Sequence, residues 1–412
     1  DVYKRQGYGW DRSFSEYTSH YYMGFPDDEV LNNAGSATET HCIGDAKSKS
    51  ALNSIYARAS YNYLDKYLLE VNGRYDGSSK FPKSSRFGFF PSVSAGWQIA
   101  QERFMNSTRH WLDGLKLRAS YGVIGNQNIN PYTFTPSMSV NNKATSWIID
   151  DTYVTSISSL PALVSQNFTW EKVGTINVGL DVNLFNNRLS GVFEWYQRNT
   201  NGMLAPGVQL PAVVGASAPY QNTADMRTRG WELSLNWRDQ IGKVGYRIGF
   251  NLSDYKSEII KYDDNAATKL LSSYYPGQTL GEIWGYVVDG YYTVDDFVDT
   301  SSWQLKEGVT SINGYNVRPG DVKFKNLRDD DTSTNVITSG DNTFDNPGDR
   351  KVIGNTTPRY QYGINLGMNY AGFDLNVILQ GTGKRDYWIS NVLTFPMNGD
   401  NSVSYTHLTL PT

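Results

Sequence analysis

Hydrophobic and polar side chains alternate with a period of two along much of this chain. In residues 115–123, for example, Leu115, Leu117 and Ala119 alternate with polar side chains. This is the period of a β-strand with two different faces, because successive side chains point to opposite sides of the sheet. No long stretch has helical periodicity, so the pattern predicts an all-β chain. The predicted strands are residues 55–63, 67–74, 92–99, 115–123, 176–184, 189–198, 231–238, 246–253, 360–370 and 373–379.

The links between these strands alternate in length. Short turns on one rim and long loops on the other are typical of outer-membrane barrels, in which the turns are periplasmic and the loops extracellular. We therefore predict a partial transmembrane antiparallel β-barrel with short periplasmic turns and long extracellular loops. The short turns are expected at 65–66, 185–188, 239–242 and 371–372, an intermediate link at 101–114, and the long loops at 124–172, 199–229 and 254–358.

The polar residues of these strands favour a membrane barrel over a soluble sheet, although any antiparallel sheet with one wet face alternates in the same way. Charged residues lie among the apolar ones, as a hydrated lumen tolerates, and aromatic residues near strand ends suit the two membrane interfaces. A soluble secreted β-protein that binds or cleaves glycans and a passive porin or adhesin remain open alternatives. The charged residues are Arg58, Arg74, Arg118, Glu194, Glu232, Arg238 and Arg247, and the aromatic ones are Trp170, Trp195, Trp231, Trp237, Tyr360 and Tyr370.

The amino-acid composition says more about possible partners than about the fold. The 412 residues include 37 Lys and Arg against 41 Asp and Glu, and this near balance gives no support to nucleic acid as a partner, so none is expected. The single cysteine, Cys42, excludes an intrachain disulfide and any multi-cysteine metal site. The mean hydropathy of -0.49 does not separate soluble from membrane β-proteins, because only alternate side chains of a membrane strand face lipid.

The two ends differ from the rest of the chain. Residues 1–6 contain neither an initiator Met nor a signal peptide, and both they and residues 403–412 resemble translated adapter sequence. We expect both ends to be non-native. Residues 7–402 are then expected to form one β-barrel fragment of a longer protein.

No catalytic constellation stands out. The histidines of residues 7–402 form neither an HExxH motif nor a pair at metal-binding spacing. The strand carboxylates Asp181, Glu194 and Glu232 could be imagined as a glycosidase pair, but the lining of a lumen explains them more simply. We predict that the protein is not an enzyme.

A set of short motifs runs in a consistent order from about residue 50 to 390. The motifs are residues 74–81 (RYDGSSKF), 89–97 (FFPSVSAGW), Glu102 with Phe104, 115–122 (LKLRASYG), 125–126, 170–171, Asn222 with Met226, 230–233 (GWEL), 285–286, 289–290, 320–321, 354–355 with Pro358, 373–375 (FDL) and 380–381. Together they resemble the SusC/RagA family of TonB-dependent outer-membrane transporters. Ala224 departs from the pattern, because the family usually has Gly before this Asp-Met pair.

The resemblance implies an importer of roughly 22 strands with a plugged lumen in the outer membrane of a Gram-negative bacterium. It also implies a SusD-like surface lipoprotein that closes the extracellular mouth, and cargo that is usually oligosaccharide and sometimes peptide. The plug and the segment that engages the TonB energy-coupling complex are expected before residue 1. The wall of such a barrel contacts outer-membrane lipid.

An acidic segment from Asn326 onward falls where many members of that family carry a calcium-like loop. Calcium needs six to eight converging oxygen ligands. Here the spacing is blurred, so a solvated acidic loop competes with a weak calcium site. Its candidate ligands are Asp329, Asp331 and Asp341, with Asp345 and Asp349 nearby.

Aromatic residues concentrate in the longest predicted loop. Flat rings can stack on sugars, while neighbouring Asp and Asn bind the hydroxyls. Alternatively, these rings pack the loop's own small core or seal it against the lipoprotein. The candidates for cargo or lid contact are Trp284, Tyr286, Tyr291, Tyr292 and Trp303, with Tyr274 and Tyr275 beside them.

Overall fold

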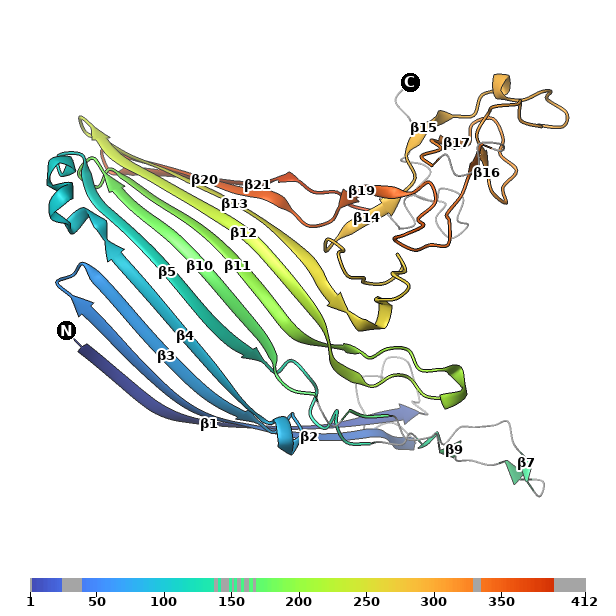
Figure 1. Cartoon of the computed structure of the whole chain (residues 1–412), viewed down its shortest axis with the longest axis horizontal. Helices are drawn as coiled ribbons and strands as arrows, with labels where there is room; N and C mark the ends of the chain where they lie inside the picture. Colours follow the sequence, from blue (N-terminus) through green and yellow to red (C-terminus); the bar gives the residue numbers. More distant parts are fainter. Residues whose placement is uncertain are drawn as a thin grey trace. The chain divides into compact units, whose positions relative to one another are not determined.

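The structure is a computed structural model that describes residues 2–23, 39–136, 140–141, 148–149, 152–153, 157–158, 163–165, 168–328 and 335–388. Its main element is an antiparallel sheet whose strands neighbour one another in chain order (Figure 1). This confirms the predicted all-β chain. Its strands are β1 (Val2–Met23), β2 (Glu39–Tyr63), β3 (Tyr67–Ser78), β4 (Phe87–Gln98), β5 (Leu112–Asn126), β10 (Glu171–Leu184), β11 (Leu189–Pro206), β12 (Tyr220–Ile241), β13 (Val244–Tyr262), β20 (Arg359–Tyr370) and β21 (Phe373–Lys384).

The links sort to two rims, because every second link of an antiparallel meander lies on the same side. Within residues 1–186 and 194–227, links 64–66 and 99–111 lie on one rim, and links 79–86, 127–170 and 207–219 lie on the other. Within residues 228–412, turns 242–243 and 371–372 lie on one rim and link 263–358 lies on the other, while turn 185–188 joins β10 to β11. The tightest turns use left-handed backbone, as at Ala371 (φ 50°) and Gly372 (φ 85°), which is the geometry of a two-residue hairpin. The links contain the 3-10 turns η3 (Lys83–Ser85), η4 (Ile99–Gln101), η5 (Arg103–Thr108), η6 (Ala212–Val214), η7 (Asp263–Asn265) and η8 (Val294–Asp296).

One predicted loop is wrong, and part of the sheet was not predicted. The expected loop 199–229 is mostly strand, since β11 continues to Pro206 and β12 begins at Tyr220. These strand ends are rich in Asn, Thr and Gly and lack clear alternation, yet their backbone still pairs. β1 and the first half of β2 were not predicted either, and β1 includes Val2–Gln6. None of the helical segments among the described residues has the length and apolar character needed to cross a bilayer.

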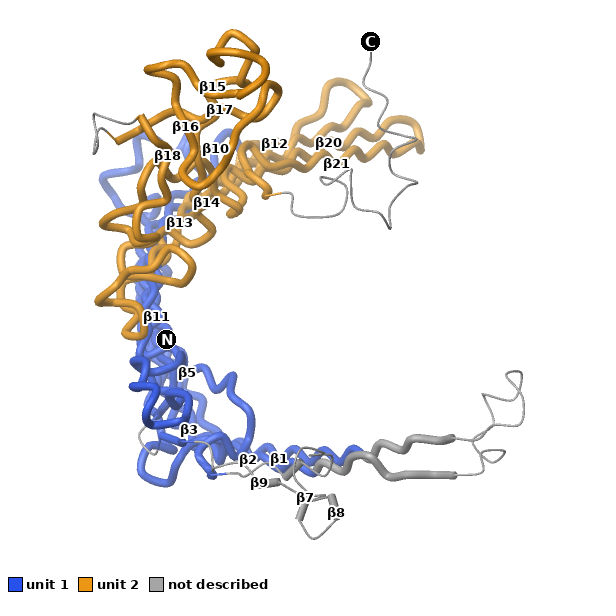
Figure 2. Tube along the Cα trace, turned by 90° about the vertical axis from the view of Figure 1, so that its right-hand side faces the viewer, with its two compact units in different colours: residues 1–186, 194–227 blue, residues 187–193, 228–412 orange. Residues whose placement is uncertain are grey.

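The chain divides into two compact units (Figure 2). Unit 1 comprises residues 1–186 and 194–227, and its strands pair in a register that sorts side chains to two faces. On one face, cross-strand neighbours are apolar; on the other they are polar. One apolar row is Ala59, Val71, Val93, Tyr121 and Ile176, and the adjacent polar row is Ser60, Glu70, Ser94, Ser120 and Asn177.

The long-loop rim of unit 1 contains a buried aromatic cluster of Phe81, Phe90, Phe168 and Trp170. Phe81 is fully buried and its ring centroid lies 4.9 Å from that of Trp170. The Trp170 indole N–H donates to the carbonyl of Arg86 at 2.9 Å. The cluster therefore joins link 79–86 to the end of link 127–170. That second link also contains the short strands β6 (Val140–Asn141), β7 (Ile148–Ile149), β8 (Thr152–Tyr153) and β9 (Ile157–Ser158).

Unit 2 comprises residues 187–193 and 228–412, and its link 263–358 folds into a small structured region. Three two-stranded sheets form there, and the buried residues Tyr292, Phe297 and Val317 make a separate core. The link is thus a folded subdomain and not an extended loop. Its sheets pair β14 (Glu282–Gly285) with β19 (Lys351–Asn355), β15 (Val288–Tyr291) with β17 (Val322–Phe324), and β16 (Ser311–Ile312) with β18 (Val336–Ile337).

Candidate functional site

The polar face of unit 1 is a network of paired charges and amides. Glu70 accepts hydrogen bonds from the Arg58 guanidinium, from the Ser60 hydroxyl at 3.2 Å and from the Asn72 amide at 3.0 Å. Asn72 also donates to the Ser92 hydroxyl at 3.3 Å. These contacts run across β2, β3 and β4 and keep each charge beside a partner.

A second part of this network is centred on Arg118 of β5. Its guanidinium donates to Asp181 of β10 at 3.1 Å and also pairs with Glu194 of β11. The Asn177 amide donates to the same Glu194 carboxylate at 3.2 Å. Arg118 and both acids keep roughly a quarter to a third of their side-chain surface exposed. Ion pairs this accessible to water contribute at most about 1 kcal/mol each, so their main effect is to make the face hydrophilic.

Two open hollows border this polar face, with volumes of about 1000 and 500 Å³. Both are lined by Arg58 and Glu70, and the larger one also by Asn72, Arg74 and Trp170. Charges of both signs and hydroxyls therefore line a surface that water can fill.

The opposite face of the same strands is exposed and apolar. Leu69, Val71 and Ile176 each leave two fifths or more of their surface uncovered. A water-soluble sheet buries such a face against a second layer. In a membrane barrel, lipid covers it.

Two of the five loop aromatics predicted to contact cargo or lid, Tyr292 and Trp303, lie in the core of the unit 2 subdomain. Tyr292 is buried, and its hydroxyl donates to the Thr310 carbonyl at 2.6 Å. Burial raises the pKa of Tyr292. Trp303 packs edge-on against Phe297, with ring centroids 5.5 Å apart. These two residues pack the loop's own core, which is one of the alternatives stated for them.

Trp284 and Tyr286 are partly buried in neighbouring contacts. The Trp284 indole N–H donates to Glu282 at 2.9 Å and to the Tyr275 hydroxyl at 3.2 Å. Burial, followed by the bond to Glu282, raises the pKa of Tyr275. Tyr286 packs against Phe324 at 5.2 Å. Tyr291, in contrast, is 67% exposed and is available for a partner.

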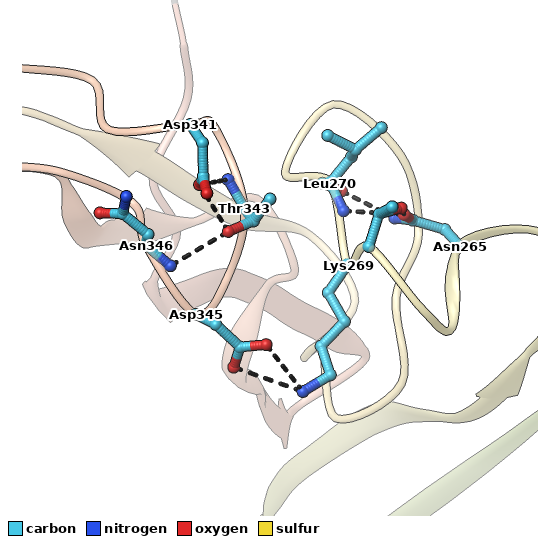
Figure 3. A network of polar contacts seen from close by, with 8 residues as sticks. Asn265, Lys269, Leu270, Asp341, Thr343, Asp345 and Asn346 are labelled. Carbon is cyan, nitrogen blue, oxygen red and sulfur yellow. Dashed lines mark hydrogen bonds and ion pairs between the residues drawn. The ribbon is translucent and has the colours of Figure 1, made fainter.

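Asp341 and Asp345 of the subdomain form hydrogen bonds or ion pairs with nearby residues. Figure 3 shows the Asp341 carboxylate accepting from the Thr343 hydroxyl at 2.7 Å and from its backbone N–H at 3.2 Å. The hydroxyl is the main cause of a lowered pKa for Asp341. Asp345 pairs with Lys269 (Figure 3). Asp329 and Asp331 lie outside the described residues, so the predicted calcium site stays a prediction.

Buried Asp349 accepts hydrogen bonds from backbone N–H groups. Its two carboxylate oxygens accept from the N–H groups of Leu327 and Thr338, both at 2.8 Å. Three or more acidic, His or Cys side chains do not converge as metal ligands anywhere in the described part of the chain.

Comparison with known proteins settles the family. The family model for the TonB dependent receptor-like β-barrel matches residues 2–409. This chain belongs to the TonB-dependent receptor family. It is 30% identical to TonB-dependent receptor P3 of Formosa agariphila over 352 residues, which cover 81% of this chain and 32% of P3.

One further curated relative and one solved structure are similar to this chain. TonB-dependent receptor SusC of Bacteroides thetaiotaomicron is 34% identical over 216 residues, which cover 52% of this chain and 21% of SusC. The RagAB peptide importer in its open-open state matches the fold with a TM-score of 0.68 and 22% identity, over 92% of this chain and 39% of that one. The predictions of a SusC/RagA-type barrel and of an outer-membrane location are confirmed. The chain spans about a third of the length of P3.

Several motif residues of this receptor barrel now have structural roles. Phe81 and Trp170 build the buried cluster, while Asn222 donates to the Thr169 carbonyl at 3.0 Å. On the short-turn rim, the Glu102 carboxylate accepts from Tyr67 at 2.7 Å, Trp97 at 3.2 Å and Lys66 at 3.2 Å. The Tyr67 hydroxyl, before the other donors, lowers the pKa of Glu102.

Sequence reasoning identified Arg58, Arg118 and Glu194 as polar-face residues but not their partners. The Arg118–Asp181 pair joins residues 63 positions apart. Only the strand register brings them together. The alternation of both segments shows which face each residue occupies, and gives no signal for which residues meet.

Proposed function

We propose that the protein containing this chain imports an oligosaccharide or another oligomeric nutrient across the outer membrane, driven by the TonB complex. The two-faced wall carries this proposal. An apolar outer face suits lipid, and a polar inner face suits a hydrated passage or a removable plug. Membership of the TonB-dependent receptor family supports active import over a passive porin or an adhesin. The proposed activity is transport, without covalent chemistry on the cargo.

The polar face supports hydrophilic cargo. Its hydroxyls, amides and paired charges can exchange hydrogen bonds with hydroxyl-rich or amide-rich molecules. RagAB, whose barrel has a similar fold, is a peptide importer, so an oligopeptide is the alternative cargo. A SusD-like lipoprotein is the proposed lid. The exposed ring of Tyr291 offers an aromatic contact on the unit 2 subdomain for that lid or for cargo.

Uptake by cells with and without the full-length gene tests the proposal. Growth on defined oligosaccharides and on defined oligopeptides as sole carbon source is compared in the wild type, the gene deletion and a deletion of TonB. Loss of growth on one oligomer class in both deletions supports TonB-driven import and identifies the cargo class. Growth that requires this gene but persists without TonB indicates a passive pore and contradicts the proposal.

The lid is tested separately by co-purification. The full-length protein, extracted in mild detergent, is expected to retain a surface lipoprotein. Tyr291→Ala is expected to weaken this retention or cargo binding, while barrel assembly, seen as a heat-dependent gel shift, stays unchanged. Unchanged lipoprotein retention and unchanged cargo binding together would remove Tyr291 from the site.

A further inference from the structure

Link 99–111 on the short-turn rim of unit 1 has more structure than a simple connection requires. It joins β4 to β5 and contains two consecutive 3-10 turns, η4 and η5 (Figure 1). The other short links between neighbouring strands, 64–66, 185–188, 242–243 and 371–372, need only two to four residues. Two strands that are direct neighbours can be joined by such a tight turn. The additional residues of this link therefore call for another explanation.

Glu102 fixes the link to the apolar side of the wall. Its carboxylate accepts hydrogen bonds from Tyr67 and Trp97, which are directly paired across β3 and β4. In the same register, Trp97 pairs with Leu117, which pairs with Leu180. The two rings thus belong to the apolar face that lipid covers. The link must lie over that face at its periplasmic margin, because its carboxylate binds the polar tips of both rings.

The part of the link beyond Glu102 displays cationic and aromatic groups. Arg103 and Arg109 are exposed, as is His110 between Arg109 and Trp111. Phe104 is 66% exposed, so its ring is not packed in the protein interior. The link's acidic side chain, Glu102, is already engaged by Lys66, Tyr67 and Trp97. The outward surface of the link is therefore positive and aromatic.

We propose that residues 99–111 form a phospholipid-binding site in the membrane leaflet that faces the periplasm. Arg103 and Arg109 bind headgroup phosphates, and Phe104 and Trp111 insert at the boundary between headgroups and acyl chains. Guanidinium groups match phosphate oxygens with two parallel hydrogen bonds, and aromatic rings concentrate at this depth of a bilayer. The site continues the lipid-covered face of unit 1, and its positive charge complements an anionic headgroup.

Lipid retention tests the site in the full-length protein. The protein is purified in mild detergent with added phosphatidylglycerol, and bound phospholipid is counted by native mass spectrometry. Arg103→Gln is expected to weaken phosphatidylglycerol binding about fivefold, the equivalent of one basic residue at a lipid surface. The matched control is Lys243→Gln, which removes one exposed positive charge from the short turn 242–243 of unit 2. Equal retention by the two variants would overturn the proposal.

A depth measurement gives an independent outcome. A spin label is attached at Phe104→Cys in full-length protein without other cysteines, reconstituted in phospholipid nanodiscs, and compared with a label at Lys243→Cys. The label at 104 is expected to be shielded from an aqueous nickel reagent and accessible to oxygen. Equal nickel accessibility at both positions contradicts insertion of the link. The heat-dependent gel shift verifies that each variant is folded.

Discussion

Replacing Trp170 by Ala should open the aromatic cluster that fastens the long-loop rim of unit 1. Trp170 is only 4% exposed, and its ring centroid lies 4.9 Å from that of Phe81 and 5.3 Å from that of Phe90. Truncating a buried aromatic side chain of this kind costs about 3–5 kcal/mol, because a cavity remains and the removed atoms lose their contacts. The bond from the indole to the Arg86 carbonyl is lost as well.

The assay is urea unfolding of the full-length protein in detergent micelles, followed by the gel mobility difference between folded and unfolded barrel. Gel mobility is preferable to fluorescence, because the substitution removes a tryptophan. Phe87→Ala is the control, since this ring is 53% exposed and stacks mainly on Tyr75. We expect a loss below about 1.5 kcal/mol for the control. A Trp170→Ala variant within about 1 kcal/mol of wild type would refute the structural role of the cluster.

Three further predictions concern polar groups. A double-mutant cycle of Arg118→Gln and Glu194→Gln, measured by the same urea titration, should give a coupling free energy below about 1 kcal/mol, because both side chains are partly hydrated. A coupling free energy of several kcal/mol would contradict a hydrated polar face. Tyr292→Phe should destabilise the unit 2 subdomain by about 1 kcal/mol through loss of its hydrogen bond to Thr310, whereas Tyr291→Phe should have no effect. Limited proteolysis of link 263–358 measures both effects, and equal cleavage of the two variants would count against the assigned core. The Thr293 backbone N–H, with Lys323, holds the pKa of Asp296 below its usual range. The Asp296 carboxylate therefore stabilises the subdomain above the ordinary Asp pKa of about 4, and this stabilisation is lost as pH falls through the lowered pKa. Proteolysis should accelerate between about pH 5 and pH 2 in wild type more than in Asp296→Asn, and identical pH profiles would refute the contribution.

The central parts of the strands were predictable because a membrane wall imposes strict alternation on them. The strand ends were not. Beyond the bilayer both faces are wet, so residues 199–206 and 220–229 carry Asn, Thr and Gly without a pattern, although their backbone still pairs. β1 was missed for a different reason: residues 1–6 were set aside as non-native, and residues 7–23 show no regular apolar alternation, although the strand pairs with β2 along its length.

For the residues of the candidate site, the sequence predicted the face of the sheet on which each one lies but not which residues contact one another. Alternation correctly placed Arg118 and Glu194 on the polar face, yet their pairing depends on a register that joins distant strands. In the long loop, composition singled out Tyr292 and Trp303 without showing that the loop has its own core. An aromatic residue in a folded loop and one on a binding surface have the same local sequence signal, and only burial distinguishes them.

The central claim is that the two faces of this sheet meet different solvents, and adjacent arginine substitutions in β3 test it most directly. Val71 belongs to the apolar row and Asn72 to the opposite, polar face. In full-length protein folded into lipid vesicles, Val71→Arg is expected to cost about 2–4 kcal/mol, as charges on the lipid face of a barrel do. Asn72→Arg, beside Glu70, is expected to cost less than about 1 kcal/mol. Equal costs for the two variants, or a larger cost for Asn72→Arg, would contradict a wall with lipid on one side and water on the other.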